Sequence, residues 1–424
     1  MYNYYIFLNL NLKNVMLRWV SFIIVFLVVE IYAFQGLKTA SKNRWVLKSY
    51  VIFNLFVYLN FFYRVFDIYI NDLNYSDQFY NYLSIPFALF FTFFCFKLTI
   101  VFFLFFEDVL RILFSVYKFF FNRSTSFLVK RRSFISKIAL FIASIPIPFV
   151  FYGIFKGRYN YKIYEYDLKF DDLPIEFDGY KITHISDIHS GSLNNVENVQ
   201  YAVDLINKQN SNLLLFTGDI VNNKANELDK WKTIFSKIEA SDGKFSVLGN
   251  HDYGDYVNWE FKYQKSENFE KLLKIQKEIG FKLLMNQNIK ISRGLNSISI
   301  IGVENWGKGG FKKKGDIDKA CEGLENDTFK IVMSHDPSHW DEILKNHKTH
   351  FHLTLSGHTH GMQFGIEIPG WIKWSPAKWA YKQWAGLYFE KKQFLNVNRG
   401  FGVLGFPGRV GIPPEISVLT LRKI

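Results

Sequence analysis

Four long apolar stretches within the first 157 residues constrain this 424-residue chain more than any other feature of its sequence. A helix needs about 20 mostly apolar residues to cross the hydrocarbon core of a bilayer. The second stretch is the least regular, because basic, acidic and amide side chains interrupt it. Residues 1–157 therefore predict a membrane domain of about four transmembrane helices, with no removable signal peptide evident. The expected spans cover residues 17–37, 46–69, 83–106 and 138–155.

Positive charge is concentrated in this membrane part. Residues 1–157 hold 16 Lys and Arg against 6 Asp and Glu, a net charge of +10, whereas residues 158–424 hold 35 against 32, a net charge of +3. The excess therefore indicates membrane topology, and the second part carries too little charge to predict a nucleic-acid partner. The two cysteines, Cys95 and Cys321, provide no disulfide framework.

The loops between the expected spans differ in charge. The first and third loops carry most of the Lys and Arg residues, whereas the second holds Asp72 and Asp77 and no basic residue. Because loops rich in Lys and Arg stay in the cytoplasm, four spans place the part beyond residue 157 on the extracytoplasmic side. If the second or another single span were absent, that side would be reversed.

Glu30 lies inside the first apolar stretch, where an ionisable side chain is costly and suggests a polar partner. Lys97 and Gln35 are the candidate partners. The favoured interpretation is a protonated Glu30 that is hydrogen-bonded inside the helix bundle.

Beyond residue 157 the sequence alternates between strand-like and helix-like segments, and mixed β-structure follows. This order predicts an α/β domain made of two sheets with helices outside them. The expected strands cover residues 161–170, 181–186, 213–217, 244–248, 282–286, 289–292, 297–303, 329–333, 351–355, 387–397 and 416–421, and the expected helices lie near 195–208, 227–237, 267–279 and 341–345.

Seven residues of metal-ligand type lie in five short motifs of this second part, and each motif follows an apolar, strand-like run. Side chains at the carboxyl ends of neighbouring strands converge, so these residues are expected to meet. Carboxylate, imidazole and amide donors suit Mn, Fe, Zn, Co or Mg. A shared carboxylate can bridge two cations, and Asp219 is the expected bridge. The motifs read Asp187-Ile188-His189, Gly218-Asp219, Gly249-Asn250-His251-Asp252, Ser334-His335-Asp336 and Gly357-His358-Thr359-His360.

At these motifs the chain resembles the calcineurin-like metallophosphoesterases, whose pattern is DxH, GD, GNH(E/D), H and GHxH. The resemblance covers about residues 160–424 and implies an α/β/β/α sandwich phosphoesterase domain, over residues 158–424, with two divalent metal ions. It implies that His251 protonates the leaving group or binds the substrate phosphate, with Asp252 orienting it. The first metal site would use Asp187, His189, Asp219 and His360, and the second would use Asp219, Asn250, His335 and His358.

Two positions depart from the family pattern. Asp252 stands where Glu is commoner, and this shorter carboxylate is expected to keep the same role. Asn222 stands where many members have a second Asp, at a position behind the metal ligands rather than among them.

The tail over residues 398–416 further resembles a bacterial, membrane-tethered branch of this superfamily. This resemblance implies a multi-pass protein of the bacterial inner (plasma) membrane. Arg399 and Arg409 in the tail would either contact the substrate phosphate or serve the structure by pairing with Glu415.

Several other residues allow both a functional and a structural interpretation. His184 is expected to be packed or hydrogen-bonded, because it points away from the strand face of Asp187. The lysine-rich run over residues 307–315 is a surface loop more readily than a phosphate-steering lid. Four further histidines are expected to be surface and strand polar groups rather than a third metal site; they are His339, His347, His350 and His352.

The segment over residues 370–388 interleaves tryptophan with lysine, which is the composition of an anchor at a membrane interface. It follows His360 closely and is expected to border the mouth of the site. A hydrophobic wall packed on the domain itself is an equally weighted alternative. The residues concerned are Trp371, Trp374, Trp379 and Trp384 with Lys373, Lys378 and Lys382.

Together these features predict a membrane-anchored, dinuclear metal-dependent phosphoesterase that uses metal-bound hydroxide as the nucleophile. Its substrate is expected to be a phosphoester, with a lipid-linked or membrane-surface one favoured by the anchor. Two alternatives stay open: a broad-specificity phosphatase or phosphodiesterase that acts on soluble substrates, and a membrane sensor or scaffold without catalysis.

Overall fold

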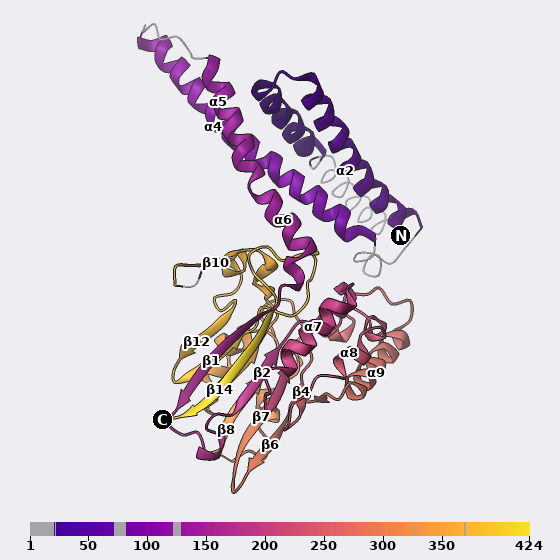
Figure 1. The fold of residues 1–424 in the computed structure, drawn as a ribbon, viewed down its shortest axis with the longest axis vertical. Coiled ribbons are helices and arrows are strands. Elements are labelled where there is room, and N and C mark those ends of the chain that lie inside the picture. The colour runs from indigo at the N-terminus through magenta and orange to yellow at the C-terminus, as the bar shows by residue number, and fades with distance from the viewer. Residues whose placement is uncertain (1–20, 22, 72–81, 122–128, 326, 369) are drawn as a thin grey trace, which may run out of the picture. The chain divides into compact units, whose positions relative to one another are not determined.

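The structure is a computed structural model that describes residues 21, 23–71, 82–121, 129–325, 327–368 and 370–424 (Figure 1). The described chain packs as two compact units. One comprises Met1–Asp67 with Ile85–Val150, and the other comprises Ile68–Ser84 with Phe151–Ile424. The domain boundary that the sequence predicts, at residue 157, stays a prediction.

Four helices of the described chain are long and apolar enough to cross a membrane: Ile23–Ala40, Arg44–Ile70 (α2), Ser84–Phe121 (α4) and Arg131–Phe155. The predicted number of spans is therefore met, and α4 continues 15 residues beyond the expected end at 106. The fourth helix consists of α5 (Val129–Ser144) and α6 (Pro146–Phe155). Pro146 explains the break, because its ring fixes φ and it lacks a backbone N–H. The beginning of the expected first span, residues 17–20, lies outside the described residues.

The acidic group within the first span has a basic partner. Lys97 is fully buried, and its Nζ lies 2.6 Å from Oε1 of Glu30, while the hydroxyl of Tyr58 contacts both side chains. The predicted partner Lys97 is therefore confirmed, and the protonated form of Glu30 stays a prediction. Charges buried in this way are tolerated when they are paired and hydrogen-bonded.

The second unit contains two six-stranded sheets. Their strand orders are β1-β14-β2-β3-β4-β5 and β12-β13-β9-β8-β7-β6, and a separate hairpin is formed by β10 and β11. The strands cover β1 Lys162–Phe170, β2 Lys181–Ile185, β3 Leu213–Phe216, β4 Lys244–Ser246, β5 Lys282–Leu283, β6 Gln287–Arg293, β7 Asn296–Gly302, β8 Phe329–Met333, β9 Leu353–Ser356, β10 Ile366–Ile368, β11 Ile372–Trp374, β12 Gly386–Glu390, β13 Gln393–Val397 and β14 Glu415–Lys423.

Helices pack on the outer face of each sheet. The α-helices of this unit are α7 Val196–Asn207, α8 Lys232–Phe235, α9 Lys262–Glu278, α10 Ile317–Ala320 and α11 Ser338–Glu342, and 3₁₀ turns cover Gly157–Tyr159, Ile175–Phe177, Ser190–Ser192, Ala225–Leu228, His251–Tyr253, Leu344–Asn346, His360–Gln363 and Pro376–Trp379.

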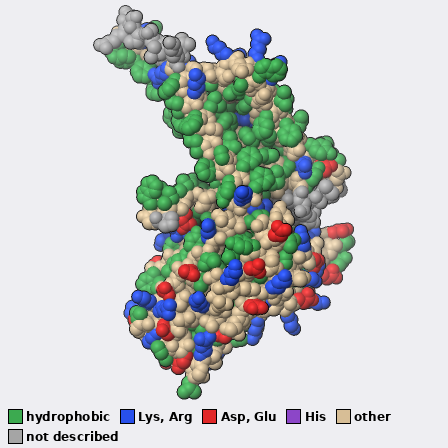
Figure 2. All heavy atoms as spheres, viewed as in Figure 1, with side chains coloured by type: hydrophobic (Ala, Val, Ile, Leu, Met, Phe, Trp, Pro, Cys, Tyr) green, Lys and Arg blue, Asp and Glu red, His purple; other side chains and the backbone are tan. Residues whose placement is uncertain are grey.

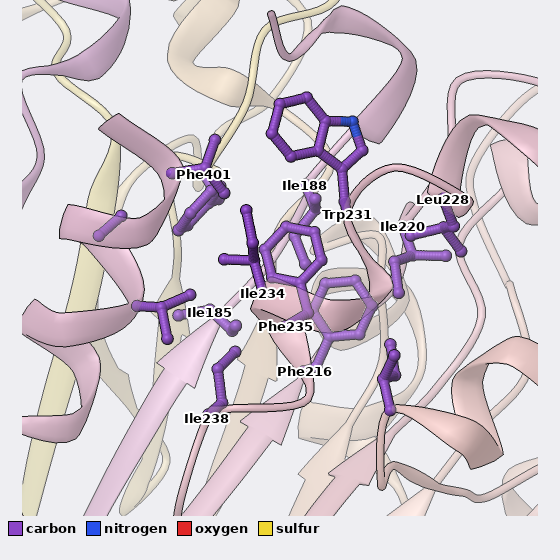
Figure 3. Packing of buried hydrophobic residues seen from close by; sticks show 14 of the residues in the cluster. Ile185, Ile188, Phe216, Ile220, Leu228, Trp231, Ile234, Phe235, Ile238 and Phe401 are labelled. Atoms are coloured by element: carbon purple, nitrogen blue, oxygen red, sulfur yellow. The ribbon is translucent and has the colours of Figure 1, made fainter. Parts of the chain in front are cut away.

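Three hydrophobic clusters establish the layers. One cluster lies between the sheets and joins residues such as Ile182 and Leu215 of the first sheet to Ile331 and Leu355 of the second. A second cluster packs α7, α8 and α9 against the outer face of the first sheet (Figure 3). A third packs α10 and α11 against the outer face of the second sheet. The predicted α/β/β/α sandwich is confirmed.

Local differences from the expected elements have local causes. The helix expected near 227–237 is a 3₁₀ turn followed by the short α8, because the buried carboxylate of Glu227 accepts N–H groups from the loop before it. The hairpin of β10 and β11 was not predicted, since its strands are only three residues long. The helix expected near 195–208 is α7, whose first turn is capped by Asn195.

Candidate metal centre

All seven predicted ligands follow a strand at its carboxyl end. β2, β3 and β4 are parallel neighbours in the first sheet, and β8 and β9 are parallel neighbours in the second. The ligands therefore come from both sheets and meet where the two carboxyl edges face each other. Asp187 and His189 follow β2, Asp219 follows β3, Asn250 follows β4, His335 follows β8, and His358 and His360 follow β9.

One group of three possible ligands contains Asp187, His189 and His360. Nε2 of His360 lies 3.2 Å from Oδ1 of Asp187 and 3.1 Å from Nε2 of His189. All three residues are buried. Three donor atoms that converge in this way on one small volume could hold a divalent cation.

A second group contains Asp219, His335 and His358. Nε2 of His335 lies 3.2 Å from Oδ2 of Asp219 and 3.2 Å from Nδ1 of His358. The same Oδ2 lies 3.7 Å from Nε2 of His189, which belongs to the first group. Asp219 thus stands between the two groups, in the position that a bridging carboxylate requires.

Asn250 supplies the test of whether this donor set fits metal ions. Its Nδ2 donates to the hydroxyl of Tyr256 at 2.9 Å, which leaves Oδ1 as the free acceptor. That Oδ1 is buried and has no hydrogen-bond partner among the described residues. A buried acceptor without a donor is costly unless a cation occupies its lone pair. The carboxylate, imidazole and amide donors therefore fit two divalent cations.

Backbone strain is concentrated at the ligands. Asp187, His189, Asp219, His358 and His360 all have positive φ, between 46° and 67°. L-residues other than glycine rarely adopt this conformation, which costs roughly 1–3 kcal/mol at each position. Such strain persists only where the surrounding structure holds it, and here it turns each ligand towards the common site.

Buried apolar residues beside the ligands provide that hold. Ile188, between Asp187 and His189, and Ile220, directly after Asp219, are fully buried in the cluster under the first sheet (Figure 3). Glycine allows the loops to approach each other, since a Cβ at Gly249 would lie 2.1 Å from Oδ1 of Asp219.

The protonation states of the ligands in the two groups depend on one another. Burial opposes a charge on His335, but the carboxylate of Asp219 outweighs it and raises the pKa of His335 to about 10. Burial lowers the pKa of His189 well below its usual value. Burial also opposes ionisation of Asp187, yet the surrounding histidines hold the pKa of this carboxyl well below its usual value. Without metal, the site therefore favours ionised carboxylates beside a protonated His335.

His251 is held by the backbone rather than by Asp252. Nδ1 of its ring lies 2.6 Å from the carbonyl oxygen of Asn222, and its backbone N–H donates to Oδ1 of Asp219 at 2.8 Å. Because a carbonyl only accepts, Nδ1 carries the proton, and Nε2 is left for a substrate. The expected orienting contact from Asp252 is therefore corrected.

Asp252 instead clamps two ligand-bearing loops together. Its carboxylate accepts the backbone N–H groups of Asp219 at 2.8 Å, Ile220 at 2.9 Å and Gly249 at 2.9 Å. Burial and the like charge of Asp219 raise the pKa of Asp252 to about 7. This carboxylate therefore positions Asp219 and is not itself directed at the site.

Two tyrosines at the site were not predicted. No sequence motif marks Tyr256, yet its hydroxyl accepts an amide N–H of Asn250 and its ring lies 4.5 Å from that of His251. The hydroxyl of Tyr381 lies 2.8 Å from Nε2 of His358, and Nδ1 of His358 faces His335 within the second group. Tyr381 belongs to the segment of tryptophans and lysines, and this contact places that segment beside the site as expected.

Arg399 makes the predicted structural pair with Glu415, and Arg409 is held by backbone carbonyls instead. Arg399 bonds both Glu367 and Glu415, and Arg409 donates to the carbonyls of Gly402 and Arg399. The guanidinium groups are therefore engaged by protein acceptors. Arg399 thus ties the tail to β14 and to β10, whereas Nη2 of Arg409 also lies 3.4 Å from Nδ1 of His360.

The remaining histidines are also structural. His184 is fully buried between Asn396, at 2.8 Å, and Thr217, at 2.9 Å, as predicted. His339 bonds Ser334 and His352 bonds Asp172. Among the described residues, the two groups above are the clusters that could hold a metal ion, and these histidines belong to neither.

The lysine-rich loop contacts the site through an aromatic residue instead of a lysine. The ring of Phe311 lies 5.0 Å from that of His358. Lys308 pairs with Glu342 and Lys312 pairs with Asp255, each at 2.6 Å. These pairs support the surface-loop interpretation over a phosphate-steering lid.

The fold and the paired ligand groups define a membrane-bound metal-dependent hydrolase. Residues 17–158 match the family model described as a probable calcineurin-like phosphoesterase transmembrane domain, and residues 180–362 match the calcineurin-like phosphoesterase model. The chain belongs to the calcineurin-like metallophosphoesterases and is a phosphohydrolase of that family.

Three relatives each match 63–64% of this chain. The uncharacterized metallophosphoesterase YkuE of Bacillus subtilis is 29% identical over 63% of this chain and 91% of its own length. An uncharacterized metallophosphoesterase of Aquifex aeolicus is 24% identical over 64% of this chain and 98% of its own. A transmembrane protein with a metallophosphoesterase domain from Danio rerio is 24% identical over 64% of this chain and 60% of its own.

Removing the shared carboxylate should cost the most metal. Asp219→Ala is expected to lower the content of both cations, because Asp219 lies beside both groups. Asn250→Ala should remove mainly one, since its Oδ1 has been assigned to the second site alone. Metal per protein, measured by mass spectrometry after dialysis, tests this. Equal loss in the two variants would contradict the bridging position.

Metal uptake should release protons. A cation and a proton compete for the same nitrogen of His335, whose pKa of about 10 keeps it protonated at neutral pH. Metal affinity should therefore rise with pH between about 7 and 10. Titration calorimetry of the metal-stripped protein in two buffers of different ionisation enthalpy counts the protons. Identical heats in the two buffers would contradict a protonated His335.

Proposed function

We propose that this protein hydrolyses phosphoesters presented at a membrane surface, lipid-linked ones included, by direct attack of water. The observation that carries the proposal is the pair of three-ligand groups joined by Asp219, in a chain that also has four membrane spans. No nucleophilic side chain of the described residues needs to form a covalent intermediate for this reaction.

The bound cations would supply two effects: activation of a water molecule and neutralisation of charge on the phosphate oxygens. The ligands would be the seven residues assigned above, and their chemistry allows Mn, Fe, Zn, Co or Mg. The buried apolar residues around the loops would limit access of bulk water and hold the donors in place.

His251 would act on the leaving group. Nδ1 donates to the carbonyl of Asn222, so the imidazolium form of His251 would present its Nε2–H to the departing oxygen, to which it gives that proton, or to a phosphate oxygen. The hydrogen bond from its backbone N–H to Asp219 ties the position of His251 to the shared carboxylate. Asp252 would serve by holding the Asp219 loop, which revises the orienting role that the sequence suggested.

The membrane anchor supports a substrate that is itself confined to a membrane, because confinement raises the encounter rate. Phospholipids, lipid-carrier phosphates and glycolipid pyrophosphates share this chemistry. The direct test is a hydrolysis panel on the full protein with added divalent metal. It compares p-nitrophenyl phosphate, bis-p-nitrophenyl phosphate and lipid phosphoesters in vesicles. Activity that is equal with and without a chelator would contradict metal-dependent hydrolysis.

Replacing His251 should affect turnover but leave the metal bound. His251→Ala should lower the rate by roughly 10²–10⁴-fold for an alkyl leaving group, because general acid catalysis is lost. The loss should be smaller for nitrophenolate, which needs little protonation. As a matched contrast, Asp252→Asn should lower metal content, since it loosens the loop of Asp219. Equal losses for both leaving groups would restrict His251 to phosphate binding.

The catalytic domain should lie outside the cytoplasm. The support is the basic first and third loops and the four spans of the described chain. In a bacterial host, alkaline phosphatase fused after Ile424 should be active, whereas a fluorescent protein that matures only in the cytoplasm should stay dark. The opposite pattern would reverse the proposed side.

A further inference from the structure

An exposed apolar surface on the catalytic unit is not used by the metal centre. It consists of Ile366, Ile368, Trp371, Trp374 and Trp379, which we call the hairpin surface. Trp371 is 77% exposed and Trp379 is 80% exposed, and the other three are also exposed. Figure 2 shows hydrophobic side chains standing out from the domain where Figure 1 places β10. Contiguous apolar surface of this kind indicates a binding site.

The exposure is selective within one segment. Trp384 is 4% exposed and packs with Ala377 and Ile412, so it follows the packed-wall interpretation of the sequence. Trp374 and Trp379 pack edge to face, with ring centroids 6.0 Å apart, and stay exposed. Two lysines beside them, Lys378 and Lys382, are exposed as well. The segment therefore has one anchored side and one free side.

The last membrane span ends directly beside this hairpin. The span closes at Phe155, and the carbonyl of Gly153, two residues earlier, accepts the N–H of Arg409 at 3.1 Å. The next residue, Val410, accepts the N–H of Gly365 at 2.9 Å and donates to the carbonyl of Gln363 at 2.7 Å. Chains hydrogen-bonded in this manner lie about 4.8 Å apart. The adjacent residues Arg409 and Val410 therefore connect the last turn of α6 to Gly365, the residue before β10.

We propose that the hairpin surface inserts into the interfacial layer of the bilayer that holds α6. Tryptophan settles at this depth, because its ring is apolar and its N–H can reach water or a headgroup. Lys378 and Lys382 would meet anionic lipid phosphates. A lipid surface is the partner that we expect for the hairpin, because hydrogen bonds through the adjacent residues Arg409 and Val410 hold the hairpin close to the end of the span.

The same segment is bonded to the metal centre. Tyr381 contacts Nε2 of His358 at 2.8 Å, Ser375 donates to the carbonyl of Gly361 at 2.6 Å, and Thr359 donates to the carbonyl of Trp384 at 2.6 Å. Docking of the hairpin would thus bring the mouth of the site to headgroup level. On the basis of the proposed function, the substrate would be an amphiphilic phosphoester that reaches the site without leaving the bilayer.

The docking test uses the full chain in phospholipid vesicles. Cys95 and Cys321 are replaced by serine, and an environment-sensitive fluorophore is attached to Trp379→Cys. The control is Leu295→Cys, a fully exposed apolar residue in the turn between β6 and β7. At position 379 we expect a blue-shifted emission and strong quenching by lipids brominated near the headgroup; at position 295 we expect neither.

Water-like emission at both positions would overturn the docking proposal. Blue-shifted emission at 379 without quenching by brominated lipid would also overturn it, because the surface would then be covered by a second copy or another protein. Neither outcome depends on catalysis, so the result stands even if the protein hydrolyses no phosphoester.

The substrate part is tested by the joint replacement of Trp371, Trp374 and Trp379 by serine. Turnover of a lipid phosphoester in vesicles should fall several-fold, while hydrolysis of p-nitrophenyl phosphate in the same sample should stay at the level of a Leu295→Ser control. If the two activities fall together, or neither falls, presentation by the hairpin is wrong. Absence of metal-dependent hydrolysis in the unmodified protein would instead reject the proposed function.

Discussion

The carboxylate of Asp219 is the group on which the rest of the centre depends. One of its oxygens lies within 3.7 Å of ring nitrogens from both ligand groups, and the other accepts the backbone N–H of His251. Behind it, Asp252 takes the N–H of Asp219 and ties it to the loop after β4. A displacement of this one side chain would therefore disturb both metal positions and the candidate acid together.

This dependence explains why the surrounding loops tolerate so much strain. Five ligands have left-handed backbone, and the isoleucines beside them are packed under the first sheet. Burial of one such side chain contributes about 1.5–3 kcal/mol, which is comparable with the cost of one strained residue. The hydrophobic core thus holds the donors in a geometry that the loops would not adopt by themselves.

Much of this arrangement could be predicted from the sequence, because the ligands occupy fixed places after apolar runs. The number of spans, the two sheets and the packed state of His184 were all predicted. The partner of His251 could not be, since a backbone carbonyl such as that of Asn222 leaves no mark on residue identity. The contact of Tyr381 with His358 likewise depends on how a long irregular segment folds back. Arg399 and Arg409 left two interpretations open, which only their buried partners distinguish.

The strand order of the first sheet has a consequence for the order of synthesis. β14 lies between β1 and β2, in parallel with β1 and antiparallel to β2. β1 leaves the ribosome soon after the last span, but its neighbour appears only when the chain has been made as far as Lys423. The sheet that carries Asp187 and Asp219 therefore lacks β14 until that point. A nascent chain would therefore have its membrane part in place well before this sheet is complete.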